Sequence, residues 1–174
     1  MRSSLGVVAL LLAACAGEEP DSFVAFQRDF EGYRSWRTID VAEADLPGFG
    51  HGTGDRTIHV SDGRRGDLFP VGTRIVKVLR AGDDPTAWPV VAMAKRGGDY
   101  NDDGALGWEW FELHLDEAER PAIVWRGEEP PAGRGYACFL GGDDDTPQGP
   151  TDCNVCHRAA ADEDYVLSPQ LAIR

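Results

Sequence analysis

The sequence predicts an α+β domain that is mainly an antiparallel β-sheet, with an N-terminal helix and a short C-terminal helix. Apolar residues recur at helical spacing after residue 21, which predicts the first helix. From about residue 57 the pattern changes to short alternating runs, separated by turns rich in glycine, proline and aspartate. No βαβ pattern and no internal repeat is present, so strands joined by short turns are expected to pair antiparallel.

The N-terminus has the pattern of an export signal. Arg2 precedes an apolar run that begins at Leu5 and ends in Leu12-Ala13-Ala14-Cys15. A basic start, a short apolar core and small residues before a cleavage site are typical of signal peptides. The run is too short to span a membrane. Its last four residues also resemble a bacterial lipobox, in which the cysteine becomes the lipidated first residue of the mature chain.

We therefore predict a lipoprotein signal at residues 1–14, a tether at residues 15–22 and one domain at residues 23–174. Cys15 is the expected lipidation site, and the alternative is an ordinary signal peptide with an incidental cysteine. Ala16 rather than aspartate follows the cysteine, as in lipoproteins sent to the outer membrane. The expected location is the periplasmic side, with the membrane contacted through the lipid only.

The charge balance limits the partners. The chain has 30 acidic and 17 basic residues and a formal net charge of −13. Such a surface repels nucleic acid and anionic membranes, so neither is expected as a partner. A basic redox partner protein is compatible with this charge, although most acidic surfaces serve solubility alone.

The elements follow from the apolar spacing. The first helix is predicted at residues 22–36, where four aromatic residues should face the core: Phe23, Phe26, Phe30 and Tyr33. Strands are predicted at residues 38–41, 57–60, 73–80, 88–95, 108–115, 123–125 and 136–140. Residues 141–150 should be irregular, a short helix should run from Cys153 to about Ala161, and residues 165–167 should pack back on the core.

One residue of the clearest strand, 73–80, does not fit an apolar environment. Ile75, Lys77 and Leu79 share one face of this strand, while Val76 and Val78 share the other. A buried ammonium is costly, so Lys77 needs an explanation. Either the strand lies at a sheet edge and the lysine reaches water, or the lysine points at a cofactor. Spacing alone does not choose between them.

The segment Cys153-Asn154-Val155-Cys156-His157 matches the attachment signature of a c-type haem. Cys153 and Cys156 lie one helical turn apart, so each can add to one vinyl group of a porphyrin, and His157 can be the axial iron ligand. The alternatives are a local disulfide and a partial zinc site, which lacks a partner pair. With haem bound, Cys138 is left over as an inert thiol or an intermolecular disulfide. Without haem, it becomes the natural disulfide partner of Cys153 or Cys156.

Two loops hold weaker candidates. His51 in a glycine-rich loop could be a second iron ligand or a distal group, although a solvated loop histidine is the stronger expectation. Asp99-x-Asn101-x-Asp103-Gly104 copies the first half of an EF-hand loop. The twelfth position is Trp110 rather than a carboxylate, so we expect an ordinary turn there and not a calcium site.

Several stretches together resemble the cytochrome P-460 family, which includes the cytochromes c prime beta. The resemblance covers most of the mature chain, and its most specific part combines a Gly-Thr-x-x-x-Lys strand with a terminal Cys-x-x-Cys-His. The matching stretches are Tyr33-Arg34-Ser35-Trp36, residues 69–77, Met93-Ala94-Lys95-Arg96-Gly97-Gly98, residues 107–113, Cys153-Asn154-Val155-Cys156-His157-Arg158 and Asp164-Tyr165-Val166.

The resemblance implies a small periplasmic monohaem protein, often a homodimer, with His157 on the iron and an open distal side for small nitrogen-oxide ligands. In the catalytic members a lysine at the position matching Lys77 is bonded to the porphyrin, and the substrate is hydroxylamine. The non-catalytic members bind nitric oxide. This sequence departs from the catalytic members because residues 90–94 lack their distal carboxylate, whose place falls near Val91.

The expected function is therefore that of an exported c-type monohaem cytochrome that oxidises hydroxylamine or binds nitric oxide. Two alternatives stay open. One is an electron-transfer cytochrome in which Met93 or His51 closes the sixth position of the iron. The other is a lipoprotein domain without haem, held together by a disulfide.

Overall fold

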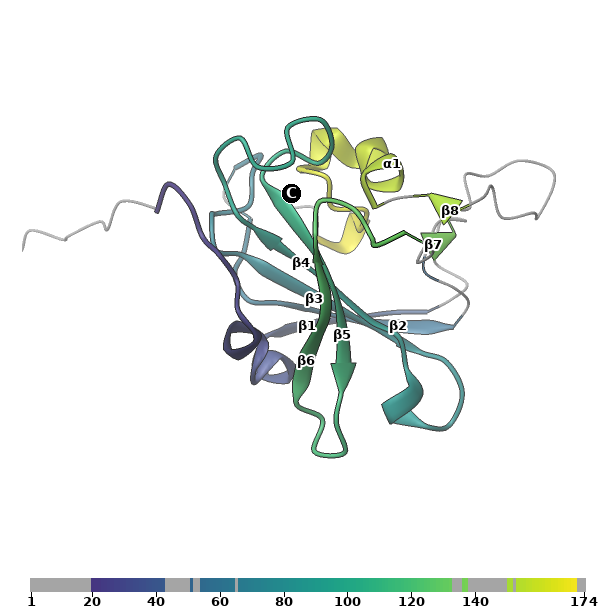
Figure 1. The fold of residues 1–174 in the computed structure, drawn as a ribbon. Helices are drawn as coiled ribbons and strands as arrows, with labels where there is room; N and C mark the ends of the chain where they lie inside the picture. Colours follow the sequence, from purple (N-terminus) through teal and green to yellow (C-terminus); the bar gives the residue numbers. More distant parts are fainter. Residues whose placement is uncertain are drawn as a thin grey trace, which may run out of the picture.

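The computed structural model describes residues 20–42, 51, 54–64, 66–132, 136–137, 150–151 and 153–171. Its main element is a six-stranded antiparallel sheet in which each strand pairs with the next along the chain (Figure 1). The strands are β1 Arg37–Val41, β2 Asp55–Val60, β3 Arg74–Arg80, β4 Val90–Lys95, β5 Trp108–Leu115 and β6 Pro121–Gly127. The predicted antiparallel sheet is thus confirmed.

The C-terminal part of the chain supplies the only α-helix among the described residues, the one-turn α1 at Cys153–His157. It continues into a 3-10 helix, η5, at Arg158–Glu163, so the predicted short C-terminal helix is confirmed. A two-stranded sheet precedes it, made of β7 Tyr136–Ala137 and β8 Pro150–Thr151. Two further 3-10 turns lie at Pro85–Ala87 (η4) and Pro169–Leu171 (η6). No helix in the described ranges is long and apolar enough to cross a membrane.

The predicted N-terminal helix is wrong. The segment instead forms two 3-10 turns, η1 at Gln27–Phe30 and η2 at Tyr33–Ser35. Gly32 between them adopts a left-handed conformation with φ +68°, which breaks a helical run. The Asp29 carboxylate accepts a hydrogen bond from the Phe26 backbone N–H at 2.7 Å, a capping bond that starts the first turn after Phe26 rather than at residue 22. Of the four aromatic residues expected to face the core, Phe30 and Tyr33 are buried and Phe23 is partly buried, but the expectation is wrong for Phe26, which is exposed.

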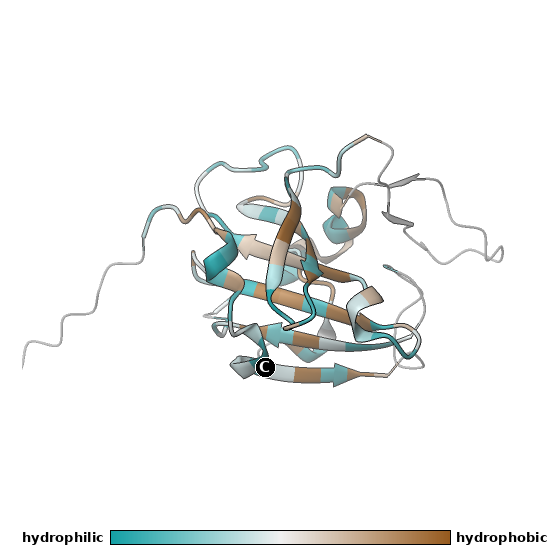
Figure 2. Ribbon diagram, turned by 60° about the horizontal axis from the view of Figure 1, so that its bottom comes forward, coloured by the Kyte–Doolittle hydropathy of each residue, from teal (hydrophilic) through white to brown (hydrophobic). Residues whose placement is uncertain are grey.

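The sheet buries both of its faces. The face covered by the C-terminal segment, called the C-terminal face below, holds a cluster that includes Ile58, Ile75, Met93, Trp108, Trp110 and Trp125. The face covered by η1 and η2, called the N-terminal face, holds a cluster that includes Phe30, Tyr33, Val76, Val78 and Phe111. Figure 2 shows that apolar residues recur along the strands. Successive side chains of a strand point to opposite faces, so these residues supply both clusters.

The position of β3 in the sheet shows whether Lys77 lies on an edge strand. Ile75 belongs to the cluster on the C-terminal face and Val76 to the cluster on the N-terminal face, so the predicted alternation along this strand is confirmed. β3 lies between β2 and β4, and Lys77 pairs with Ile58 on one side and Val91 on the other. The expected edge position of this strand is therefore wrong, while the Lys77 side chain is half-buried and partly reaches water.

Candidate cofactor site

The motif helix lies against the C-terminal face of the sheet (Figure 1). Cys153 packs against the apolar cluster there, and Val166 is buried in the same cluster, as predicted for residues 165–167. The imidazole of His157 contacts the indole of Trp110, with ring centroids 4.5 Å apart. The helix therefore presents its histidine to the sheet rather than to solvent.

Asn154, the second residue of the motif, fixes α1 to the sheet. Its Oδ1 accepts hydrogen bonds from Asn101 Nδ2 at 2.9 Å, from Trp110 Nε1 at 2.9 Å and from the Ala105 backbone N–H at 3.2 Å. Its Nδ2 donates to Asn101 Oδ1 at 3.0 Å and to the Glu128 carbonyl at 3.1 Å. Because the amide is buried and satisfied on both sides, the position of the helix is fixed by the protein itself.

His157 is held as a neutral imidazole with a defined tautomer. Its Nδ1 lies 2.6 Å from the carbonyl oxygen of Tyr165. A carbonyl oxygen only accepts hydrogen bonds, so Nδ1 carries the proton and Nε2 keeps its lone pair. Burial lowers the pKa of His157 to about 4, against the opposing effect of the bond to Tyr165. A neutral imidazole whose Nδ1–H donates to a backbone carbonyl is the usual form of a metal-binding histidine.

Cationic side chains gather near His157 on the same side of the sheet. Burial, and then the charge of Arg56, lower the pKa of Lys77 to about 7, while Cys153 acts in the opposite direction. Burial also lowers the pKa of His51 well below its ordinary value, and the charges of Lys77, His157 and Arg56 lower it further. His51 is half-buried and lies within electrostatic range of Lys77, His157 and Arg56, so the expectation of a fully solvated loop histidine is wrong.

Glu112 is a site residue that the sequence reasoning missed. It pairs with Val91, which in turn pairs with Lys77, so the three residues form a row across β3, β4 and β5. Strands lie about 4.8 Å apart, which puts the Cα atoms of Lys77 and Glu112 about 10 Å apart. Trp125 Nε1 donates to Glu112 Oε2 at 2.8 Å and fixes the carboxylate. The alternation along residues 108–115 could have identified Glu112 from the sequence, because it places Glu112 on the same face as Trp108 and Trp110.

The cysteines are placed only in part. Cys153 is half-buried at the start of α1, within electrostatic range of Lys77. Cys156 takes part in a disulfide whose partner is not among the described residues. Cys138 and the predicted lipidation site Cys15 lie outside the described residues. A thioether requires a thiol, so this disulfide has to be reduced before Cys156 can bind a porphyrin vinyl group.

The loop that copies an EF-hand serves the anchoring of α1. Asn101 is 4% exposed and has a left-handed backbone with φ +56°. Its Nδ2 also donates to the Trp108 carbonyl at 3.0 Å, and the Gly104 N–H donates to the Asn101 carbonyl at 3.1 Å. The expected turn is confirmed. A side chain on residue 104 would meet Asn154 at 2.3 Å, so the glycine lets the loop approach the motif.

The residues on the C-terminal face fit a covalently attached haem once Cys156 is reduced. A single helical turn presents two sulfur atoms, and the adjacent imidazole keeps Nε2 available for iron. Apolar and aromatic side chains of the cluster would surround a porphyrin, and the nearby cations suit its carboxylates. Comparison of the chain with family models, with curated proteins and with solved structures found no match.

Proposed function

We propose that this chain is an exported c-type monohaem cytochrome, similar to the cytochrome P-460 family, that binds or oxidises a small nitrogen compound such as nitric oxide or hydroxylamine. The observation that carries the proposal is the bond from His157 Nδ1 to the Tyr165 carbonyl. It leaves Nε2 of a neutral imidazole available beside two cysteines at haem-attachment spacing.

Each residue has a role in this proposal. Cys153 and Cys156 would form the two thioethers, and His157 would be the axial ligand. The bound haem would supply ligand binding at iron and electron transfer. Lys77, with a pKa of about 7, carries a neutral and therefore nucleophilic amine in about half of the molecules at neutral pH. This agrees with the resemblance, which implies that Lys77 bonds to the porphyrin.

Glu112 would supply the carboxylate that residues 90–94 lack. It lies in the same row as Lys77 and Val91, and its Oε2 is fixed by Trp125. Oxidation of hydroxylamine releases protons, and a positioned carboxylate accepts protons at a rate advantage of about 10²–10⁴-fold. We therefore propose Glu112 as the proton acceptor if the chain is catalytic. A protein that only binds nitric oxide does not need this group.

Two features of the location are part of the proposal. Lipidation at Cys15 would anchor the chain on the periplasmic side, at the outer membrane. Electrons would leave through a redox partner protein, and a homodimer is implied by the resemblance. The electron-transfer alternative requires a sixth ligand, and Met93 is buried within the apolar cluster on the face that carries the site.

A second candidate function is a lipoprotein domain without haem, stapled by a disulfide. The disulfide at Cys156 favours it. The two candidates make opposite demands on this sulfur, because a thioether and a disulfide cannot share it. The state of Cys156 in the exported protein therefore separates them.

The test is the absorption spectrum of the full chain, exported from cells that carry a haem-attachment system. We expect a covalent haem spectrum in the wild-type protein and loss of the native axial ligation in His157→Ala. His114→Ala is the matched control, since His114 is exposed on β5 and should leave the spectrum unchanged. A colourless wild-type protein with the Cys156 disulfide intact would contradict the proposal and support the second candidate.

A further inference from the structure

We propose that Asp164, held by Lys95, is the positioning residue that fixes the orientation and the tautomer of the His157 imidazole. The consequence for a bound haem rests on the proposed function. The geometric claim does not, because the bonds that support it are made within the polypeptide.

Asp164 ties the end of η5 to three separate segments of the domain. Its Oδ1 accepts a hydrogen bond from Lys95 Nζ on β4 at 2.6 Å, and its Oδ2 accepts one from the Phe69 backbone N–H at 2.9 Å. Its backbone carbonyl accepts from Trp108 Nε1 on β5 at 2.8 Å. The residue is 3% exposed, so water does not compete for these bonds.

Lys95 is itself fixed. Its Nζ donates to the Leu106 carbonyl at 3.1 Å and lies 5.0 Å from the centre of the Trp108 ring. Asp164 therefore has a buried, immobile counter-ion rather than a flexible surface lysine. A buried pair of this kind contributes little net stability against an apolar pair, but it fixes geometry.

The backbone at Asp164 explains why this geometry is needed. Asp164 and Tyr165 both adopt left-handed conformations, with φ +53° and +64°. Left-handed backbone is costly for residues other than glycine and persists only where the surroundings enforce it. The two residues turn the chain after η5 so that the carbonyl of Tyr165 meets Nδ1 of His157. The bonds of Asp164 supply what holds this turn.

His157 is thus held from two independent ends. Asn154 anchors the helix that carries the histidine, and Asp164 anchors the carbonyl that orients its ring. If Asp164 loses its charge, α1 should stay in place while the acceptor for Nδ1–H becomes loose. The proton can then also occupy Nε2, which blocks that nitrogen as a metal ligand.

The test compares Asp164→Asn and Lys95→Met with the matched control Glu163→Gln. Glu163 is the residue next to Asp164, and its exposed carboxylate pairs with Arg64 without touching Tyr165. Trp108→Phe is a fourth variant that removes the bond to the Asp164 carbonyl and keeps both charges, although it also shortens a buried ring that packs on Phe69 and Lys95. It keeps the test decisive if a charge variant does not fold. Nitrogen-15 NMR of the full haem-free chain reports which nitrogen of His157 is protonated.

We expect one tautomer, with the proton on Nδ1, in the wild type and in Glu163→Gln. In the other variants we expect a mixture, with a measurable fraction protonated on Nε2. In haem-loaded protein the same variants should have a higher midpoint potential than the wild type, because a weaker Nδ1–H bond makes the axial imidazole a poorer donor. The midpoint potential of the control, Glu163→Gln, should equal that of the wild type.

A single Nδ1–H tautomer in every folded variant would overturn the inference, whatever happens to thermal stability. An unshifted midpoint potential in haem-loaded Asp164→Asn would do the same. If the wild type takes up no haem, the proposed function fails, and the NMR comparison still decides the role of Asp164.

Discussion

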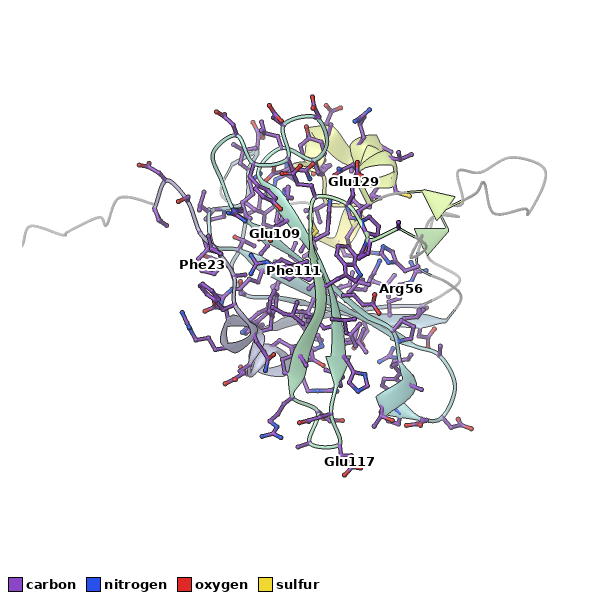
Figure 3. The ribbon with its side chains drawn as sticks, viewed as in Figure 1. Phe23, Arg56, Glu109, Phe111, Glu117 and Glu129 are labelled. Atoms are coloured by element: carbon purple, nitrogen blue, oxygen red, sulfur yellow. The ribbon has the colours of Figure 1, made fainter. Side chains whose placement is uncertain are left out.

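The two faces of the sheet bury charged side chains in different ways. On the N-terminal face, Glu109 is 2% exposed and is paired with Arg126 through two bonds of 2.6 Å and with Arg96 at 3.4 Å. On the C-terminal face, Lys77 lies at the centre of the sheet, and no described carboxylate is within salt-bridge distance of it. Figure 3 labels Glu109 and Phe111 on one side of β5 and β6 and Arg56 on the other.

The difference separates charges that hold the fold from charges available for chemistry. Glu109 joins β5 to β6, and its partner Arg126 also donates to the carbonyl of Ala25, which secures the N-terminal segment. Lys77 instead has its pKa lowered to about 7 by burial and by the charge of Arg56, which costs stability, and the proposed function assigns it a chemical role. If this comparison is right, removing the two charges should change stability in opposite directions.

The largest effect is expected for Glu109→Gln. This change leaves two largely buried guanidinium groups without a full counter-charge, which typically costs about 3–5 kcal/mol. The free energy of unfolding in urea measures it. Glu119→Gln is the matched control, because Glu119 pairs with Arg34 at the surface and should cost less than about 1 kcal/mol. Equal effects of the two changes would remove the structural role assigned to Glu109.

Asn154→Ala should be nearly as damaging, although no charge is lost. It deprives Trp110 Nε1, the Ala105 N–H and the Asn101 amide of a buried partner. Each unsatisfied group costs about 1–3 kcal/mol where water does not replace the partner, so a total loss of about 2–4 kcal/mol is expected. Urea unfolding of the haem-free protein would show it. A loss below about 1 kcal/mol would mean that α1 is not fixed through this amide.

Lys77→Met should have the opposite sign. It replaces a poorly solvated ammonium by an apolar side chain of similar length, so the haem-free protein should gain about 1–3 kcal/mol at pH 7. The same change should abolish any bond between the protein and the porphyrin beyond the two thioethers. Destabilisation by Lys77→Met would contradict the contrast between the two faces, since it would give Lys77 a structural role like that of Glu109.

The most gradual effect, and the smallest for each step measured, is a pH dependence. The pKa of Lys77 is about 7 in the folded chain against an ordinary value of 10.5. Between these values the unfolded chain binds more protons, so the free energy of unfolding should rise with pH, by at most about 1.4 kcal/mol per pH unit. Below about pH 7 both states are protonated and the contribution is flat. The free energy of unfolding, measured from pH 7 to pH 10, should not show this rise in the Lys77→Met variant.

The local parts of this picture could be predicted from sequence. Alternation along residues 73–80 predicted the two faces of β3 and singled out Lys77, and the spacing of the cysteines predicted α1. The N-terminal helix was mispredicted because aromatic spacing reports burial, while the Asp29 cap starts the first turn after Phe26 and the left-handed Gly32 ends the helical run. Periodicity measures which side is buried, and it does not measure which hydrogen bonds form.

The rest of the site depends on contacts between distant residues. Asn154 meets Asn101, 53 residues earlier, and Asp164 meets Lys95, 69 residues earlier. Glu112 lies near Lys77 because both residues pair with Val91 of β4. Such pairings follow from how β4, β5 and the C-terminal segment come together, which local patterns do not encode.

Intact-mass and peptide mass spectrometry of the exported, mature protein is the most direct test of the central claim, that a porphyrin is bonded to this chain beside His157. We predict a chain that begins at a lipidated Cys15 and carries the mass of one haem on the peptide that contains Cys153 and Cys156. Any further haem–protein bond should map to Lys77. A mature chain without that added mass, with Cys156 still in a disulfide after export alongside a haem-attachment system, would contradict the account.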